Sequence, residues 1–362
     1  MGFIGSHTVD SLIADGYDVV VMDNLERQVH LGKRPDYLNR KAKYVIGDVR
    51  FQKDWSKALR GVDSVIHLAA SVGIGQSFWE SRKYLQTNVV GTTTLFELLT
   101  KEPALKKSIS KIVVASSKSL YGEGAYRCSR HGVFYPEQRG LSQLRAGDWE
   151  VRCAVCGAPG SAVGVPEEKP PQNLNPYSLS KYATERLALD YSYALGIPAV
   201  AFRYFNAYGP RQSLSNPYTG VLAIFLSRIK NGKRPVVFED GNQLRDFIYV
   251  EDIAHANVLA LERGEGVYNL GTGRPSSLLQ MVTMINNELG TGIEPDVTGD
   301  FRPGDNRHDF ADNMKFLKSF GPKVFTGLSD GVSKLVEWSL RQKAQDRFSS
   351  AESLRKKYIP GA

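Results

Sequence analysis

The chain has 362 residues, of which 42% are hydrophobic and 23% charged, a composition typical of a soluble globular protein with room for two domains. No apolar run approaches the roughly 18 to 20 residues of a membrane-spanning helix and no signal peptide is visible, so we expect a cytoplasmic protein without a membrane partner. The net charge is +8, but the basic residues are spread along the chain, which favours a phosphate-bearing small substrate and argues against a nucleic-acid partner.

The start of the chain carries half of a glycine pattern. Gly2 and Gly5 have the spacing of the last two glycines of G-x-x-G-x-x-G, and a helix is predicted directly after them. Such a turn lets the backbone approach a dinucleotide pyrophosphate at a helix N-terminus. Because G-x-x-G alone is a weak signal, an ordinary loop-to-helix junction is the alternative.

Asp23 ends an apolar run about 20 residues after this turn, where a carboxylate would accept hydrogen bonds from adenosine ribose hydroxyls. The alternative is a solvated residue that starts a turn. Together with the glycines, Asp23 favours NAD over NADP, because a carboxylate repels a 2′-phosphate.

Short apolar runs alternate with helix-length segments through the first 120 residues. This alternation predicts an α/β fold with a doubly wound parallel sheet of the Rossmann type, covered by helices on both faces. Apolar residues at helical spacing predict helices over residues 6–15 and 84–99. The predicted strands lie within residues 17–23, 43–49, 64–70, 110–117 and 198–209.

Residues 122–170 break this pattern and are interpreted as an insertion that holds all three cysteines. Cys128-x-x-His131 and Cys153-x-x-Cys156 are separated by 21 residues, and a glycine follows each pair. Two such turns fit a tetrahedral structural zinc site with four protein ligands and no open position for catalysis. Three free thiols beside a surface histidine, or a redox cysteine pair, are the alternatives.

Helical periodicity returns over residues 177–195, with Tyr177 and Lys181 four residues apart on one face. A lysine ammonium near a phenol lowers the phenol pKa, which would make Tyr177 a base at neutral pH. By spacing alone, such a pair is usually two surface neighbours. Ser117, at the end of the predicted strand 110–117, favours the catalytic interpretation because it could hydrogen-bond a reacting hydroxyl.

Seven motifs follow one another in the order typical of extended short-chain dehydrogenases/reductases. The chain resembles this family, which includes the NAD-dependent nucleotide-sugar epimerases and dehydratases, from Gly2 to about Leu340 outside the insertion. The motifs are GFIGSH, HLAA at 67–70, TNVVGT at 87–92, SSKSLYG, PYSLSK, RYFNAYGPRQ at 203–212 and RDFIYVEDIA at 245–254.

The resemblance implies a role for individual residues. Ser117, Tyr177 and Lys181 match the catalytic serine, tyrosine and lysine, of which the last two also contact the cofactor. Further cofactor positions fall on Gly2, Gly5, Asp23, Asp48, Val49, Leu68, Ala69 and Asn88. The substrate positions are Ser117, Asn206, Arg245, Arg302 and Asp305. Two alternatives remain open: Asn88 as a helix cap, and Arg245 with Asp246 as a surface ion pair.

The resemblance also implies a reaction. Dehydratases of the family place an Asp-Glu pair directly after the catalytic serine or threonine, whereas this chain has Lys118 and Ser119. We therefore expect epimerisation at C4 of a nucleotide sugar through a 4-keto intermediate, with NAD bound throughout. The cysteine-bearing insertion is similar to that of the dTDP-L-rhamnose 4-epimerase group. Another nucleotide-sugar oxidoreductase or decarboxylase reaction, or a non-catalytic binding homologue, is the alternative.

The expected domains are an NAD-binding domain over residues 1–195 and the last sheet strands with a mixed nucleotide-sugar-binding domain over 196–342. A tail, as a terminal helix or a loose segment, follows over 343–362. The family resemblance places one strand before Gly2, so we expect two sheet strands with unpaired edges and weak NAD binding by the chain as given. The resemblance also implies a homodimer through helices near 84–99 and 177–194, whose apolar faces fit a four-helix contact.

Overall fold

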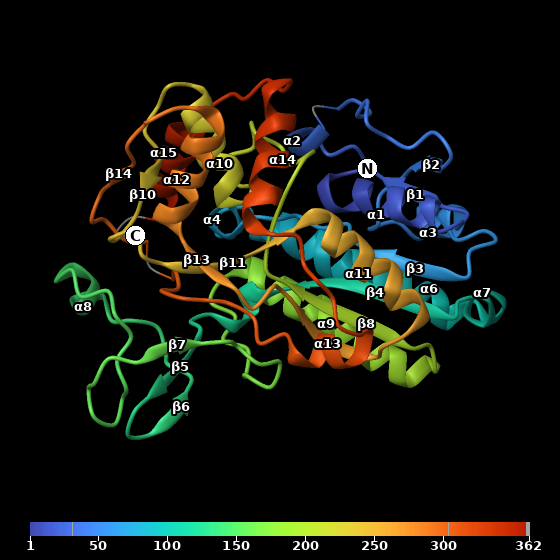
Figure 1. The fold of residues 1–362 in the computed structure, drawn as a ribbon. Helices are drawn as coiled ribbons and strands as arrows, with labels where there is room; N and C mark the ends of the chain where they lie inside the picture. Colours follow the sequence, from blue (N-terminus) through green and yellow to red (C-terminus); the bar gives the residue numbers. More distant parts are fainter. Residues whose placement is uncertain (31, 303, 360–362) are drawn as a thin grey trace.

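A computed structural model describes residues 1–30, 32–302 and 304–359 (Figure 1). Its centre is a parallel sheet of four strands in the order β12-β8-β4-β3. Two further parallel strands, β1 and β2, form a separate pair. The bounds are β1 (Val20–Asp23), β2 (Lys43–Ile46), β3 (Ser64–His67), β4 (Lys111–Ser117), β8 (Ala199–Tyr204) and β12 (Gly266–Leu270).

Helices cover both faces of the sheet, which confirms the predicted doubly wound α/β class. Alternate residues of β4 point to opposite faces: Ile112 and Val114 pack with one helical layer, and Val113 and Ala115 with the other. The first layer is α3 (Gln52–Ala58), α6 (Gly91–Lys101) and α9 (Pro176–Leu195). The second is α1 (Phe3–Ala14), α11 (Val250–Glu262) and α13 (Met314–Phe320).

The sheet is divided between β1 and β3. Among the described residues, β1 pairs with β2 alone and β3 with β4 alone, as expected for two strands with unpaired edges. Residues of both strands line one large cleft, Val21 and Met22 from β1 and Val65 and Ile66 from β3.

The helix predicted over 84–99 consists of three segments that follow one another without a break. They are α5 (Ser81–Tyr84), the π-helical η1 (Leu85–Val90) and α6. A π-helical turn inserts one extra residue and often lies at a functional site.

A second lobe packs its own core beside the sheet. Its helices α10, α12 and α14 meet around Met281, Phe225 and Leu335. The bounds are β9 (Asn206–Tyr208), α10 (Val221–Lys230), β10 (Val236–Val237), β11 (Leu244–Tyr249), β13 (Pro275–Ser277), α12 (Leu278–Leu289), β14 (Asp296–Val297), α14 (Leu328–Leu340) and, at the end, α15 (Phe348–Tyr358). The tail was expected to be either a terminal helix or a loose segment, and the structure shows a helix, α15.

The insertion forms a small unit that projects from the body at the lower left of Figure 1. Three antiparallel strands in the order β6-β5-β7 make its sheet. Its elements are β5 (Ala125–Cys128), β6 (Gly132–Phe134), α8 (Leu141–Arg145) and β7 (Ser161–Val163). At its base, fully buried Val165 bridges to Ala311, so the insertion is joined to the body by packing and not only by its two chain ends.

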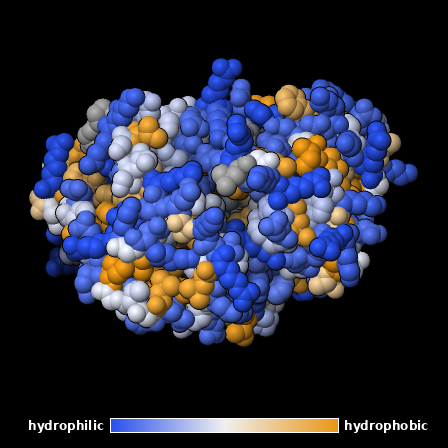
Figure 2. All heavy atoms as spheres, turned by 90° about the horizontal axis from the view of Figure 1, so that it is seen from above, coloured by the Kyte–Doolittle hydropathy of each residue, from blue (hydrophilic) through white to orange (hydrophobic). Residues whose placement is uncertain are grey.

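The surface is mainly polar. Figure 2 shows a largely hydrophilic face on which apolar side chains form small separate groups. Within the described ranges, no helix combines the length and apolar character that crossing a membrane requires. The remaining short helices are α2 (Arg27–His30), α4 (Ile74–Ser77), α7 (Pro103–Ser108) and η2 (Lys118–Tyr121).

Candidate active site

A cleft of about 1330 Å³ runs along β1 and β3 and reaches the carboxyl ends of β4 and β8, the edge at which ligands bind in open α/β sheets. Ser117 at the end of β4 and both Tyr177 and Lys181 on α9 line it. The three residues predicted to be catalytic, which come from two elements about 60 positions apart, are therefore brought together.

The start of α9 fixes where Tyr177 and Lys181 lie. The Asn175 side chain accepts a hydrogen bond from the Ser178 backbone at 2.8 Å, and the Ser178 hydroxyl accepts one from the Asn175 backbone at 3.2 Å. This capping box, with Pro176 in the first turn, sets the first residue of the helix. Gly196, in the left-handed conformation at φ 69°, ends it.

Burial controls the protonation of both groups. It raises the pKa of the Tyr177 phenol, and the neighbouring Ser117 hydroxyl offsets part of that rise. It also lowers the pKa of the Lys181 ammonium to about 8, although the Glu185 carboxylate acts in the opposite direction. The lowering of the phenol pKa that we expected from Lys181 is therefore not found in this structure.

A buried polar network behind α9 was missed by sequence reasoning. Glu185, one turn after Lys181, accepts hydrogen bonds from the Ser116 hydroxyl at 2.6 Å and from the Arg203 guanidinium at 2.6 and 3.0 Å. Arg203 also donates to the Tyr121 hydroxyl at 2.7 Å. The only sequence signal for this network is that Arg203 interrupts the apolar strand pattern of residues 198–209 and Glu185 interrupts the helical pattern of residues 177–195. The network ties α9 to β4 and β8, and so holds Lys181 beside Ser117.

Six of the predicted cofactor residues line the same cleft: Gly2, Gly5, Asp23, Val49, Leu68 and Ala69. Gly2 directly precedes α1, so the first amides of the helix lie at the cleft. Asp23 accepts hydrogen bonds from the Met1 ammonium at 2.9 Å and from the Leu25 amide at 2.7 Å. Burial works to raise the pKa of Asp23, but His30 and the Met1 ammonium hold it well below its usual value.

The other two predicted cofactor residues, Asp48 and Asn88, are not among the residues that line the cleft, and their side chains bind protein groups. Asp48 binds the Arg50 guanidinium at 2.7 Å. Fully buried Asn88 accepts from the Ser71 amide at 2.7 Å and donates to the Ser180 hydroxyl at 2.8 Å. It lies inside η1 and not at the start of a helix, so the helix-cap alternative is wrong. Asn88 joins the loop after β3 to α9, and its contact with a cofactor stays a prediction.

Asn206 lines the cleft and donates to the Asp246 carbonyl at 3.0 Å. The Arg245 guanidinium donates to the carbonyl groups of Asn306 at 2.8 Å and Arg307 at 2.9 Å. Asp246 is fully buried and accepts hydrogen bonds from the residue 271–273 turn instead, so the alternative of an Arg245–Asp246 surface ion pair is wrong.

Arg302 lies with its guanidinium 4.0 Å from the centre of the Phe238 ring and pairs with Glu352 of α15. The backbone carbonyl of Asp305 accepts a hydrogen bond from Arg139 at 3.0 Å. Lys118, directly after Ser117, forms an ion pair of 2.5 Å with Asp309. Arg245, Arg302 and Asp305 thus lie around the second lobe, and their contacts with substrate stay predictions.

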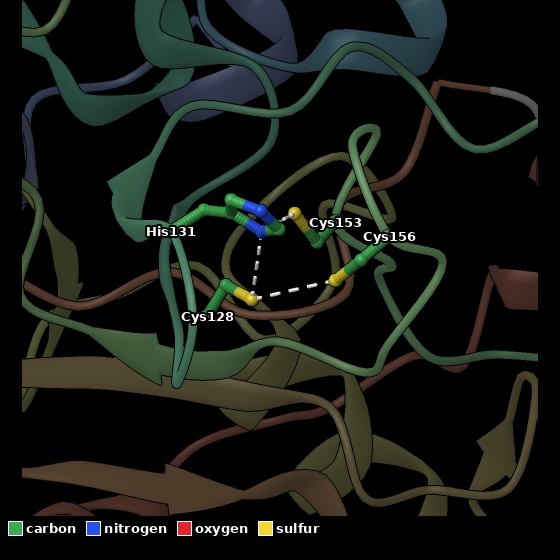
Figure 3. A group of neighbouring side chains, drawn as sticks. All are labelled: Cys128, His131, Cys153 and Cys156. Atoms are coloured by element: carbon green, nitrogen blue, oxygen red, sulfur yellow. Dashed lines mark hydrogen bonds between the residues drawn. The ribbon is translucent and has the colours of Figure 1, made fainter.

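The Cys/His cluster of the insertion has the dimensions of a metal site (Figure 3). The Cys128 sulfur lies 3.6 Å from His131 Nδ1 and 3.7 Å from the Cys156 sulfur, and Cys153 lies 3.5 Å from His131 Nδ1. A tetrahedral ion with bonds of about 2.3 Å to sulfur and about 2.0 Å to nitrogen separates its ligand atoms by about 3.5 to 3.8 Å. A disulfide would bring two sulfurs to about 2.05 Å.

The two turns also have the conformation expected of metal knuckles. Gly132 and Gly157 adopt φ of 75° and 71°, which only glycine reaches at little cost. The backbone amides of Arg130 and His131 point at the Cys128 sulfur and lower the pKa of its thiol to about 6. Amides in this orientation stabilise a thiolate, the form of cysteine that binds metals.

Comparison with known sequences decides the family. The NAD dependent epimerase/dehydratase family matches residues 1–137 and 153–271, more than half of the chain. The chain belongs to this family. The gap between the two matched ranges, 138–152, falls inside the insertion, so the family match and the break in the sequence pattern agree.

Several relatives of this epimerase/dehydratase family member are named as nucleotide-sugar 4-epimerases. A dTDP-L-rhamnose 4-epimerase from Burkholderia thailandensis is 36% identical over 93% of this chain and 92% of its own length. A putative UDP-glucose 4-epimerase from Methanocaldococcus jannaschii is 33% identical, with 93% and 95% covered. The crystal structure of a UDP-glucose 4-epimerase with UDP-glucose from Thermotoga maritima has a TM-score of 0.77 at 29% identity and covers 94% and 96% of the two chains.

Proposed function

We propose that the protein is an NAD-dependent nucleotide-sugar 4-epimerase and that dTDP-L-rhamnose is the first substrate to test. The observation that carries the proposal is the convergence of Ser117, Tyr177 and Lys181 on one cleft. The names of the Burkholderia and Thermotoga relatives support the reaction type, and the first of them supports the choice of sugar.

Each of the three side chains has a distinct task. Tyr177 takes the proton from the sugar 4-hydroxyl, and the Ser117 hydroxyl holds that oxygen by a hydrogen bond. For the reaction itself we assign the Lys181 ammonium the task of stabilising the phenolate through its charge, an effect that the pKa of Tyr177 in this structure does not show. Loss of this proton from the oxygen and of a hydride from C4 gives the 4-keto sugar, which turns in the cleft so that the hydride would return to the opposite face of C4 while Tyr177 gives the proton back to the oxygen.

The residues along the cleft fit a dinucleotide. The amino end of α1 favours the negatively charged pyrophosphate, and Asp23 suits the ribose hydroxyls of adenosine. NAD, when bound, supplies the hydride acceptor and donor for C4. A Thermus thermophilus UDP-glucose 4-epimerase solved in complex with NAD, with a TM-score of 0.73 at 26% identity, supports this cofactor.

The residues after Ser117 support epimerisation over dehydration. Elimination of water needs a proton acceptor and a proton donor near C5 and C6 of the sugar. Lys118 is engaged by Asp309 at 2.5 Å, and the Ser119 hydroxyl donates to Ser117 Oγ at 2.9 Å. Neither side chain supplies a carboxylate.

The proposal is tested by incubating the purified protein with NAD and either dTDP-L-rhamnose or UDP-galactose, and following the C4 configuration by NMR. We expect an equilibrium mixture of the C4 epimers with no net NADH. Conversion with stoichiometric NADH would indicate an oxidoreductase, and no conversion of any nucleotide sugar would contradict an enzyme of this kind.

We also propose that Cys128, His131, Cys153 and Cys156 hold a structural zinc ion. The spacing of the ligand atoms and the two glycine turns support it, and soft thiolate ligands favour zinc among the common divalent ions. All four ligands are protein groups and none of them lines the catalytic cleft, so the ion braces the insertion and takes no part in the reaction.

We further infer a homodimer that pairs η1 and α9 of each protomer. Leu85, Val90 and Leu179 are 39%, 47% and 48% exposed on these adjacent helices. Apolar side chains on two neighbouring helices are buried when the same helices of a second copy pack against them, in a four-helix arrangement. A cytoplasmic location remains our prediction from the sequence.

A further inference from the structure

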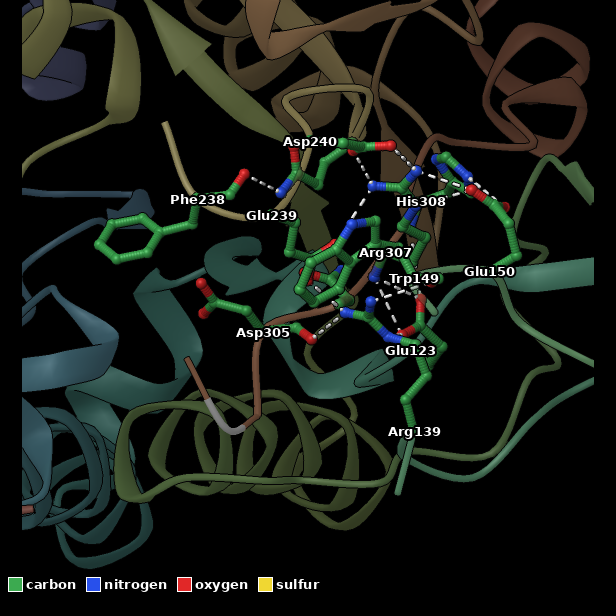
Figure 4. Close-up of polar contacts among 12 residues, drawn as sticks. Glu123, Arg139, Trp149, Glu150, Phe238, Glu239, Asp240, Asp305, Arg307 and His308 are labelled. Carbon is green, nitrogen blue, oxygen red and sulfur yellow. Dashed lines mark hydrogen bonds and ion pairs between the residues drawn. The ribbon is translucent and has the colours of Figure 1, made fainter. Parts of the chain in front are cut away.

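A cluster of charged side chains, buried at its centre and open to solvent at Glu150 and Asp240, joins the insertion to the second lobe (Figure 4). The insertion contributes Glu123, Arg139 and Glu150, and the second lobe contributes Glu239, Asp240 and Arg307. Four carboxylates thus surround two guanidinium groups. Because the interior screens charge poorly, such a cluster holds its members in defined positions.

Arg139 is the member that reaches the candidate substrate segment directly. Its side chain is 3% exposed, and its Nη2 lies 2.8 Å from a Glu239 carboxylate oxygen. The same nitrogen donates to the Asp305 carbonyl at 3.0 Å, and Nη1 donates to the Trp149 carbonyl at 3.0 Å. One planar group from the insertion therefore fixes a carboxylate of the second lobe and the backbone of residue 305.

Arg307 extends this connection. It shares Glu239 with Arg139, at 3.1 Å, and binds Asp240 at 2.6 and 2.9 Å. Its backbone amide donates to the Glu123 carboxylate at 2.8 Å. The Arg307 and Glu239 side chains are 1% and 3% exposed, so the contact between these two is shielded from water.

The segment held in this way contains one predicted substrate residue, Asp305, and contacts another, Arg245. Arg245 donates to the carbonyls of residues 306 and 307, at 2.8 and 2.9 Å. Asp309, two residues later, binds Lys118 at 2.5 Å, beside Ser117. Residues 305–309 thus contact both the insertion cluster, through Asp305 and Arg307, and the pair Arg245 and Lys118.

We propose that Arg139 is a positioning residue for substrate binding: through Asp305 and the pair Glu239–Arg307, it sets the residue 304–309 backbone against which Arg245 is oriented. The insertion then determines how tightly the nucleotide sugar is held, not how fast the bound sugar reacts. This proposal rests on the proposed function. Lysine cannot replace Arg139, because an ammonium cannot span Glu239 and two carbonyl oxygens in one plane.

The test compares Arg139→Lys, which keeps the charge and loses the planar fork, with Arg139→Gln, which loses both. Arg152→Lys is the matched control, since Arg152 lies in the same insertion but forms an exposed ion pair with Asp148. For Arg139→Lys we expect a KM for the nucleotide sugar raised by roughly tenfold, with kcat within about twofold and bound NAD unchanged. The Kd of UDP or dTDP, measured by calorimetry, should rise in parallel, and more so for Arg139→Gln.

These measurements separate the possible results. An unchanged KM and Kd in folded Arg139→Lys, or a loss of kcat and NAD content in step with KM, would overturn the positioning role. If the wild type epimerises nothing but Arg139→Lys still weakens UDP binding, the proposed function fails and the positioning role stands. If the wild type binds neither UDP nor dTDP, both fail.

Discussion

Tyr177 is a phenol whose pKa burial raises, although its proposed task requires it to lose a proton. The positive charge of Lys181 is the group best placed in the sequence to favour the phenolate, but burial lowers the pKa of that ammonium to about 8. At the scale of single residues, burial therefore disfavours the charged form of both side chains, and the contribution of each can be tested separately.

Replacement of Tyr177 by Phe removes the proton acceptor and leaves the ring. We expect kcat to fall by about 10²- to 10⁴-fold, the usual contribution of general base catalysis, with NAD content and thermal stability unchanged. Tyr193→Phe is the control, because Tyr193 lies on the same helix and is 94% exposed. Equal kcat values for the two variants would contradict the assignment of Tyr177.

The pH profile tests Lys181. A lysine is charged below its pKa and neutral above it, so the stabilisation of the phenolate is present below about pH 8 and is lost as the pH rises through that value. We expect kcat/KM to decline above about pH 8. Lys181→Arg keeps its charge to high pH, so its remaining activity, although lower, should not decline there. If kcat/KM declined in the same way above pH 8 in the wild type and in Lys181→Arg, the decline would come from the titration of another group.

At the scale of elements, the insertion is a unit with its own three-stranded sheet and a Cys/His cluster. Its contacts with the body run through Val165 at its base and through the buried charges around Arg307. A sheet of only three short strands gains from a further constraint, and we expect the Cys/His cluster to provide one by binding a metal ion.

Replacement of Cys153 by Ser should remove the metal. We expect wild-type protein to contain about one zinc per chain by elemental analysis, and Cys153→Ser to lose it together with several degrees of thermal stability. Val155→Ala is the control, because Val155 lies between the ligands Cys153 and Cys156 but is 75% exposed. A wild-type protein purified without zinc, and equally stable in chelator, would show that the cluster is three free thiols and a histidine.

At the scale of the whole molecule, the same helix α9 has two faces with different tasks. One face places Tyr177 and Lys181 at the cleft, and the other exposes Leu179 beside η1. Dimer formation through the second face would hold the catalytic face rigidly against the sheet. Assembly and catalysis are then linked through one element.

Replacement of Leu179 by Glu places a charge in the middle of the proposed dimer contact. We expect the wild type to sediment at about twice the chain mass of 40.1 kDa and Leu179→Glu to sediment as a monomer, because an unpaired buried carboxylate is costly. Val324→Glu is the control, since Val324 is 93% exposed away from these helices. A wild-type monomer, or a dimer that Leu179→Glu leaves intact, would contradict the contact.

Much of this fold follows from short stretches of sequence. Alternating apolar runs predicted the strands, and Asn175, Pro176 and Gly196 determine α9, because capping and chain reversal depend on residues within one helical turn. The two Cys/His pairs with their glycines likewise predicted that these four side chains converge, as the structure shows, whereas the zinc ion itself stays a prediction. Ser117, Tyr177 and Lys181 were identified by motif, since each lies at the end of an element whose position is set locally.

The partners of the buried polar groups were decided only by the tertiary structure. Glu123 binds the amide of Arg307 across 184 positions, and Asn88 binds Ser180 across 92. Nothing in the neighbouring sequence of either residue specifies such a partner, because a buried polar group takes the complementary group that packing brings within about 3 Å. By itself, the sequence therefore determined the strands of the parallel sheet and the helix α9, and it identified the residues that we propose to be catalytic. Only the tertiary structure decided how the insertion contacts the second lobe, because those contacts are made between segments that lie far apart in the sequence.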